Sequence, residues 1–186
     1  MAARTRSEVP PPLGSSTRAG YVAYADLEPH NMPSPYQSPT KRLAVEVLID
    51  DGSRLVGDVY LHPNTMAPGG YESPLTMIDD HAWFYPVSEE GGAVALVGKR
   101  RTVSLSYASP GDAAVPESTA ATDRVSLEVL LSDGSTLSGW ALLELPRAQP
   151  RTLDFLNGPG SFLTIHDDAR VHLVNRAHIR TVHPLD

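Results

Sequence analysis

Apolar and polar residues alternate in two stretches of the chain, and each stretch runs directly into an Asp-Gly pair. The first is VEVLIDDGSRLVG (residues 45–57), and the second is LEVLLSDGSTLSG (residues 127–139). Alternation with a period of two is typical of a half-buried strand, and Asp-Gly favours the positive φ of a tight turn. Each copy therefore predicts a β-hairpin. The identical positions are Glu46/Glu128, Val47/Val129, Leu48/Leu130, Asp51/Asp133, Gly52/Gly134, Ser53/Ser135, Leu55/Leu137 and Gly57/Gly139.

The two copies also share their later pattern. Gly57 and Gly139 stand within or at the end of the outgoing strand, where glycine often marks a bulge or a sharp bend. Each copy then closes with an apolar strand, a polar break and a short strand, in AVALVGKRRTVSLS (93–106) and ARVHLVNRAHIRTV (169–182). The break falls at Gly98 and at Asn175. Because glycine and asparagine readily adopt the left-handed region, we expect one left-handed turn at each position.

These elements predict an all-β chain made of two tandem small barrels, because no window carries a sustained helical period. We expect a first barrel over residues 43–107, a linker of small residues and proline over 108–123, and a second barrel over 124–186. Residues 1–42 hold seven prolines. Such a segment buries too little apolar surface to offset its ordering entropy, so we expect a disordered or extended tail.

One apolar island interrupts this proline-rich tail, in the stretch YVAYADL (residues 21–27). It can serve as a docking peptide that adds a strand to a partner or fills a groove on it. Alternatively, it lies over the chain's own barrels, and the sequence leaves both interpretations open. The candidate partner-binding residues are Tyr21, Val22, Tyr24 and Leu27.

The composition of the chain argues against several classes of function. The chain has 186 residues, no cysteine and a formal net charge of −7. Without cysteine there are no disulfides, thiol nucleophiles or thiolate metal sites. The negative charge disfavours nucleic-acid binding by bulk electrostatics. No stretch approaches the about 20 apolar residues of a membrane span, and no signal peptide is recognisable, so we expect a cytoplasmic protein without membrane contact.

Each copy is expected to have five short strands, with a bending glycine in the second strand and a strand, a turn and a strand at its end. This layout resembles that of small SH3-like barrels, most closely the Sm-like (LSm) branch. LDFLN (residues 153–157) is similar to the first motif of that family, and LVGK (96–99) and LVNR (173–176) are similar to the second. The resemblance implies two Sm-like barrels and an RNA site near these motifs. The chain is also similar to uncharacterised bacterial domains with FLN and LVN segments, which imply no function.

Basic residues gather at the matching place in both copies and offer a candidate phosphate-binding surface. The alternative interpretation is that they solvate a turn and the exposed face of a last strand. With the two polar residues of the first Sm-like motif, the candidate nucleic-acid-binding residues are Lys99, Arg100, Arg101, Asp154, Asn157, Arg176 and Arg180.

The sequence gives little support for metal binding, nucleophilic catalysis or nucleotide binding. The clusters DDH (79–81) and HDD (166–168) could ligate a divalent metal, but they occupy non-equivalent positions, and Asp-Asp is also typical of a turn. His172, His178 and His183 alternate with apolar residues and are expected to face solvent or a partner. No Gly-x-Ser-x-Gly elbow or phosphate loop is present.

We therefore expect a non-enzymatic interaction or scaffold subunit without cofactor, metal or catalytic residues. It would bind a protein partner, or a second copy of itself, through the tail and exposed strand edges. The alternative is an Sm-like nucleic-acid-binding protein that uses the basic turns of both repeats.

Overall fold

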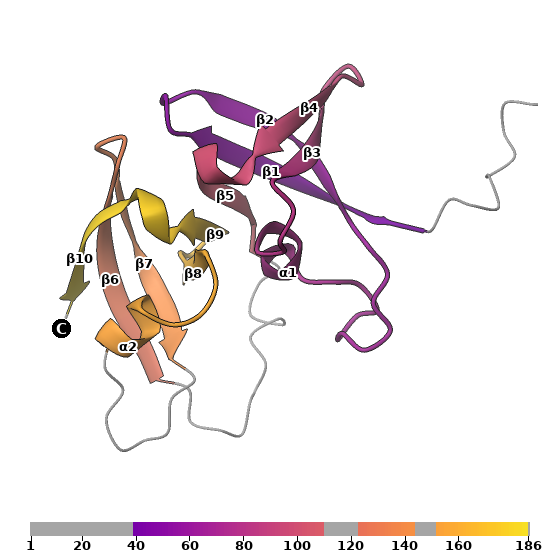
Figure 1. Ribbon diagram of the computed structural model, residues 1–186. Helices are drawn as coiled ribbons and strands as arrows, with labels where there is room; N and C mark the ends of the chain where they lie inside the picture. The colour runs from indigo at the N-terminus through magenta and orange to yellow at the C-terminus, as the bar shows by residue number, and fades with distance from the viewer. Residues whose placement is uncertain (1–38, 110–122, 144–151, 186) are drawn as a thin grey trace, which may run out of the picture. The chain divides into compact units, whose positions relative to one another are not determined.

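The computed structural model describes residues 39–109, 123–143 and 152–185, which belong to one compact unit, Ser38–Asp186. Ten strands in these residues form one sheet in which all neighbours are antiparallel (Figure 1). The strand order is β10-β6-β7-β8-β9-β5-β1-β2-β3-β4. The prediction of an all-β chain is confirmed at this level, with two short helices in addition.

The first repeat begins with the predicted hairpin. Gly52 at its turn has a φ of 85°, which a glycine adopts without the steric cost of a Cβ. A short helix follows, started by Pro74 and capped by Ser73, whose hydroxyl accepts the N–H of Thr76 at 3.0 Å. The elements are β1 (Lys41–Ile49), β2 (Arg54–Leu61), α1 (Pro74–Ile78), β3 (Phe84–Glu89), β4 (Val94–Gly98), the 3₁₀ helix η2 (Lys99–Arg101) and β5 (Thr102–Ala108).

The second repeat has the same order of elements, and Gly134 at its hairpin turn has a φ of 87°. In each repeat the first strand pairs with both the second and the last strand. The elements are β6 (Asp123–Leu131), β7 (Thr136–Leu143), α2 (Thr152–Leu156), β8 (Phe162–His166), β9 (Arg170–Asn175), the 3₁₀ helix η4 (Arg176–His178) and β10 (Ile179–Leu185).

Gly57 and Gly139 are required for a reason other than a bulge. Neither has a positive φ. Instead, a Cβ on Gly57 would overlap the carbonyl of Ser88, and one on Gly139 would overlap the carbonyl of His166. These glycines permit a close approach of neighbouring strands where the second strand of each repeat meets the third.

The expected left-handed turns at Gly98 and Asn175 are wrong. Their φ angles are −74° and −72°, and each residue is the extended N-cap of a 3₁₀ helix. The helices η2 and η4 therefore reverse the chain, so no residue in the turn needs positive φ. Asn175 accepts the N–H of Ala177 on its side chain at 3.0 Å, which is an ordinary capping contact.

The two repeats are joined through their strands. β5 of the first repeat pairs with β9 of the second, from Ser104↔Val174 to Ala108↔Arg170. Phe162 and Leu173 of the second repeat pack into the core of the first. Leu48 and Val103 of the first repeat pack into the core of the second. Each repeat thus supplies part of its neighbour's core, and both hydrophobic cores depend on this junction.

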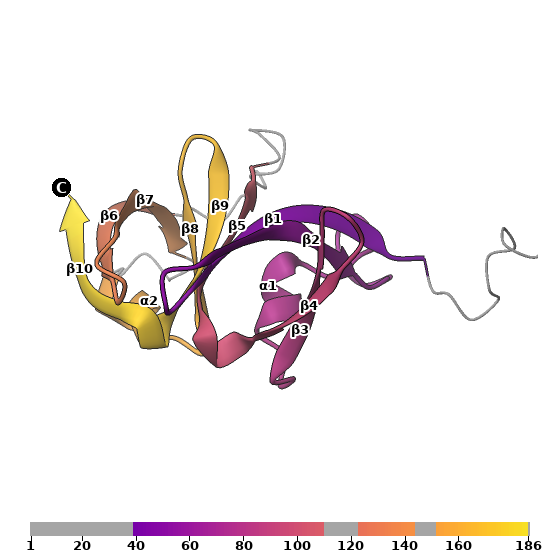
Figure 2. The same cartoon turned by 90° about the horizontal axis from the view of Figure 1, so that it is seen from above.

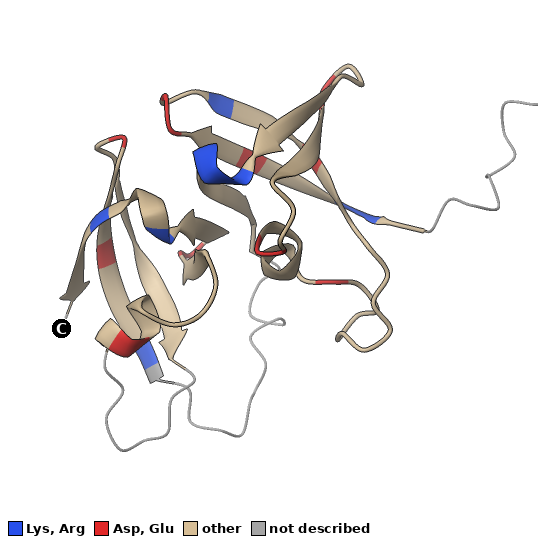
Figure 3. Cartoon of the chain, in the orientation of Figure 1, with Lys and Arg blue, Asp and Glu red and all other residues tan. Residues whose placement is uncertain are grey.

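Among the described residues, no helix has the length and hydropathy needed to cross a membrane. Figure 3 shows basic residues at η2 and acidic residues at the β1–β2 and β6–β7 hairpin turns.

Candidate functional site

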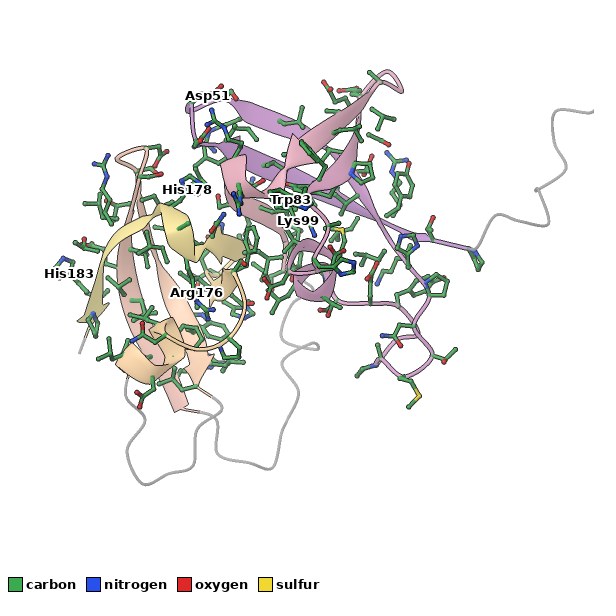
Figure 4. All side chains as sticks on the ribbon, in the orientation of Figure 1. Asp51, Trp83, Lys99, Arg176, His178 and His183 are labelled. Carbon is green, nitrogen blue, oxygen red and sulfur yellow. The ribbon has the colours of Figure 1, made fainter. Side chains whose placement is uncertain are left out.

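The basic turns of the two repeats, predicted separately, border one pocket. Its volume is about 710 Å³, and it lies between η2, η4 and the segment before β3. Figure 4 labels four of the residues that line it, Trp83, Lys99, Arg176 and His178. Of the seven candidate nucleic-acid-binding residues, the structure brings together Lys99, Arg100 and Arg176 at this pocket.

The ammonium group of Lys99 already has hydrogen-bond partners within the fold. The residue is buried, and its Nζ donates to Oδ1 of Asp80 at 2.6 Å and to the carbonyl of Met77 at 3.1 Å. The Lys99 hydrogen bond holds the pKa of Asp80 below its usual value. Because its charge already has a carboxylate partner, Lys99 fixes the loop after α1 and offers little to an external phosphate.

The guanidinium of Arg176 also has hydrogen-bond partners within the fold. Its Nη1 donates to the carbonyls of Gly158 and Pro159, both at 2.8 Å, and also to the carbonyl of Gly160. Burial lowers the pKa of the guanidinium. The side chain therefore holds the Gly-Pro-Gly turn before β8 in place, and its Nη1 has no donor left for a ligand.

Arg100 and Trp83 form the exposed part of the pocket. The guanidinium carbon of Arg100 lies 4.7 Å from the centroid of the Trp83 ring, which is a cation–π contact. His178 anchors the same turn, because its Nε2 lies 2.9 Å from the carbonyl of Arg100 and its Nδ1 lies 2.9 Å from Oγ of Ser132. Sequence reasoning missed Trp83, although it stands in the most aromatic stretch of the chain, before the strand that pairs with β4.

The other predicted basic and polar residues lie away from this pocket. Arg101 pairs with Asp50, with Nε and Oδ1 3.1 Å apart. Arg180 donates to the carbonyl of Ser132. Asp154 lies in α2 and Asn157 follows it, and neither lines the pocket. The candidate tail residues Tyr21, Val22, Tyr24 and Leu27 lie outside the described residues.

A second candidate surface is the edge made by β3 and β4. Phe84, Val94 and Leu96 are large apolar residues that are 62%, 59% and 72% exposed. Their counterparts in the second repeat, aligned from the shared strand pattern, are Phe162, Val171 and Leu173, which are 4%, 3% and 0% exposed. We call Phe84, Val94 and Leu96 the apolar edge.

The difference between the two sets follows from pairing. β9 has β5 on its outer side, whereas the outer side of β4 pairs with no strand in the described part of the chain. Natural edge strands often carry lysine, proline or a bulge that prevents association. The sequence of β4 is VALVG, which has no charge and no proline. The apolar edge is therefore suited to another strand.

The two acid–histidine clusters, residues 79–81 and 166–168, make hydrogen bonds that hold neighbouring segments of the fold together. Asp79 accepts the N–H of Ser161 at 2.6 Å. Asp167 accepts the N–H groups of Ala169 and Arg170 and lies 2.9 Å from Nε2 of His172. Burial opposes ionisation of Asp167, but these hydrogen bonds outweigh it and lower the pKa. No group of three or more such side chains could hold a metal ion within the described ranges.

The expectation that His172 faces solvent or a partner from a strand edge is wrong. His172 is buried, and its Nδ1 lies 2.8 Å from Oγ of Ser106 across the β5–β9 pair. The alternation of apolar residues around it suggested a one-sided strand, but β9 is covered on both edges. His183 is exposed on β10, away from the pocket residues labelled in Figure 4.

Comparison of the chain with protein-family models, curated proteins and solved structures finds no match. The described residues therefore establish the chain as an all-antiparallel β protein with one ten-stranded sheet.

Proposed function

We propose that the chain is a non-enzymatic interaction or scaffold subunit that binds a protein partner through its open strand edge, with the N-terminal tail as a second contact. The observation that carries this proposal is the apolar edge. Val94 and Leu96 stay exposed on β4, whose N–H and C=O groups are open on one side, and Phe84 stays exposed on the neighbouring strand β3. Strand addition uses such backbone groups for affinity and the side chains for specificity.

We further propose that each repeat is a small SH3/Sm-like barrel. The order of strands and short helices is the same in both repeats. The pairing of the first strand with both the second and the last strand supports barrel closure. The 3₁₀ helix before the last strand, at η2 and η4, adds to this likeness.

Affinity capture from the native cell tests the interaction. Leu96→Lys should place a charge in the apolar edge and remove the partner from the captured set. The matched control is Val56→Lys, because Val56 is equally exposed but lies on β2, a strand paired on both sides. A partner that Leu96→Lys and Val56→Lys both capture as well as the wild type would contradict binding at this edge.

A second candidate function is nucleic-acid binding, favoured by the exposed Arg100–Trp83 pair. An aromatic ring beside a guanidinium can stack a base, which contributes about 1–3 kcal/mol per base. The net charge of −7 opposes it. If single-stranded RNA binds there, binding should weaken steeply with salt and with Trp83→Ala, while Arg42→Ala should have little effect. No binding at low salt excludes this function.

A further inference from the structure

Equivalent positions on the first three strands of the two repeats carry different side chains. In the first repeat, Arg42 of β1 pairs with Asp58 of β2, and Asp58 lies opposite Ser88 of β3. The corresponding residues of the second repeat are Arg124, Trp140 and His166. The carboxylate is thus replaced by an indole and the hydroxyl by an imidazole, the side chain that changes charge near neutral pH.

The three side chains of the second repeat form a stack. The guanidinium carbon of Arg124 lies 4.3 Å from the centroid of the Trp140 ring, which is a cation–π contact. The ring of His166 is nearly parallel to the same indole, with the centroids 4.3 Å apart and 11° between the planes. Ala141 and Ile165, the neighbours along each strand, pack in the core of the second repeat. Because side chains alternate along a strand, Trp140 and His166 point outward.

This stack lies over the narrowest junction of the second repeat. β7 and β8 lie side by side in Figures 1 and 2, but Trp140 and His166 are the only residues that pair between them in the described part of the chain. By contrast, β8 and β9 pair from Phe162↔Asn175 to His166↔Val171. Because few backbone hydrogen bonds join β7 to β8, the stack of Trp140 on His166 contributes much of what holds the two strands together.

We propose that the β7–β8 junction is a pH-sensitive switch built into the second repeat. While His166 is neutral, its ring stays on Trp140 and keeps β7 against β8. When His166 takes up a proton, the junction loosens, and the facing edges of β7 and β8 open. The first repeat has no such switch at this position, because Ser88 stands where the second repeat has His166 and does not titrate.

Positive groups face His166 from two strands. Arg124 and His166 each lie 4.3 Å from the same indole, so protonation of His166 places two cations within about 9 Å of each other, less than a Debye length at moderate salt. His172 of the neighbouring strand β9 adds to the repulsion when it is charged. Burial and the charges of Arg124 and His172 lower the pKa of His166.

The carboxylate next to His166 in the chain is already engaged. Asp167 accepts the N–H groups of Ala169 and Arg170 and lies 2.9 Å from Nε2 of His172. Asp168 is exposed in the turn before β9. The β8–β9 turn therefore stabilises a charge on His172 rather than one on His166.

His166 also lines a second pocket, which has a volume of about 490 Å³ and mostly apolar walls. The other titratable residues of this pocket are Lys41, Tyr71, Glu72 and Tyr107. The carboxylate of Glu72 accepts the N–H of His62 at 2.8 Å, and Lys41 brings a further positive charge. An apolar wall and a lysine both disfavour a charged imidazole at this place.

The direction of the effect follows from the lowered pKa of His166. The unfolded chain takes up the proton near pH 6.5, and the folded chain takes it up only at a lower pH. The stabilisation by neutral His166 is therefore complete above pH 6.5 and is lost as the pH falls through the lowered pKa of the folded chain. The junction is closed at neutral pH and opens in acid.

NMR of the full chain tests the inference. A titration of the histidine ring signals should show one imidazole that titrates below pH 6.5 and is absent from His166→Phe. Amide hydrogen exchange at about pH 8 and about pH 5, corrected for the pH dependence of intrinsic exchange, should show that the amides bonded between β7 and β8 lose protection in acid. The amides bonded between β2 and β3, the equivalent junction of the first repeat, are the internal control and should keep theirs.

Two variants separate the proton on His166 from other effects of acid. His166→Phe keeps an aromatic ring on Trp140 with no proton to gain, so the protection between β7 and β8 should not change with pH. Arg124→Met removes one cation, which should move the titration of His166 toward pH 6.5 and the opening of the junction with it. Circular dichroism checks that both variants fold. If His166→Phe does not, the wild-type titration with its β2–β3 control still decides.

A His166 ring that titrates at or above pH 6.5 would overturn the inference, because the proton would then stabilise the stack. So would equal protection between β7 and β8 on both sides of the His166 titration, because the charge on His166 would then leave the junction closed.

Discussion

Truncation of the equivalent phenylalanines of the two repeats, Phe162 and Phe84, should lower the free energy of unfolding by very different amounts. Phe162→Ala removes a ring that is 4% exposed and packed in the core of the first repeat. Such a truncation typically costs about 3–5 kcal/mol, from the lost transfer free energy and the cavity left behind. Phe84→Ala removes a ring that is 62% exposed. With about a third of the ring buried, its cost should be about 1 kcal/mol or less.

Urea denaturation followed by circular dichroism measures both values. The protein should be dilute, because association would stabilise the folded chain by mass action and increase the apparent cost of Phe84→Ala. The expected difference between the two variants is about 2–4 kcal/mol. Equal costs would refute the reasoning, because they would mean that Phe84 is covered as fully as Phe162, or that the junction between repeats does not bury Phe162.

Four further predictions follow from single residues. Gly52→Val should lower the free energy of unfolding by about 1–3 kcal/mol, because a β-branched residue is strained at the positive φ of this position. Gly52→Asn should lower it little, and equal melting temperatures for the two variants would contradict this. Gly57→Ala should also destabilise by about 1–3 kcal/mol, by overlap with the neighbouring strand, and an unchanged denaturation midpoint would show that the strands separate freely. Hydrogen bonds from two arginines lower the pKa of Glu46 from 4.5, so its stabilising effect is complete above pH 4.5 and is lost as the pH falls through the lowered value. Glu46→Gln should flatten the acid side of the melting-temperature profile, and an unchanged profile would be evidence against these ion pairs. Burial raises the pKa of Tyr85 to about 12 and also raises that of Tyr107, so an absorbance titration of Tyr85→Phe should lose one of the late phenolate steps of the wild type. Because the folded pKa of Tyr85 is raised, stability should fall as the pH rises from 10 toward 12.

Local patterns were enough to predict the strands and the hairpins. Alternation and Asp-Gly act within a few residues, and Gly52 and Gly134 have the positive φ that the dipeptide indicated. The reason for Gly57 was not predictable, because its close contact is with Ser88 on another strand. The left-handed turn expected at Gly98 failed because a 3₁₀ helix can reverse the chain with ordinary φ.

The candidate sites depended on long-range pairing. Lys99 and Arg176 are basic residues in turns, which is typical of phosphate-binding surfaces, but the fold supplies Asp80 and three carbonyls that occupy them. Likewise, Leu96 and Leu173 stand in similar sequences. Only the pairing of β9 with β5 decides that Leu173 is buried while Leu96 is exposed.

Amide hydrogen exchange of β4 tests most directly the claim that this strand edge is open to a partner. In dilute solution the Leu96 amide should exchange fast, and the Leu173 amide, which faces β5, should be protected. A Leu96 amide that is as strongly protected as the Leu173 amide would contradict the account.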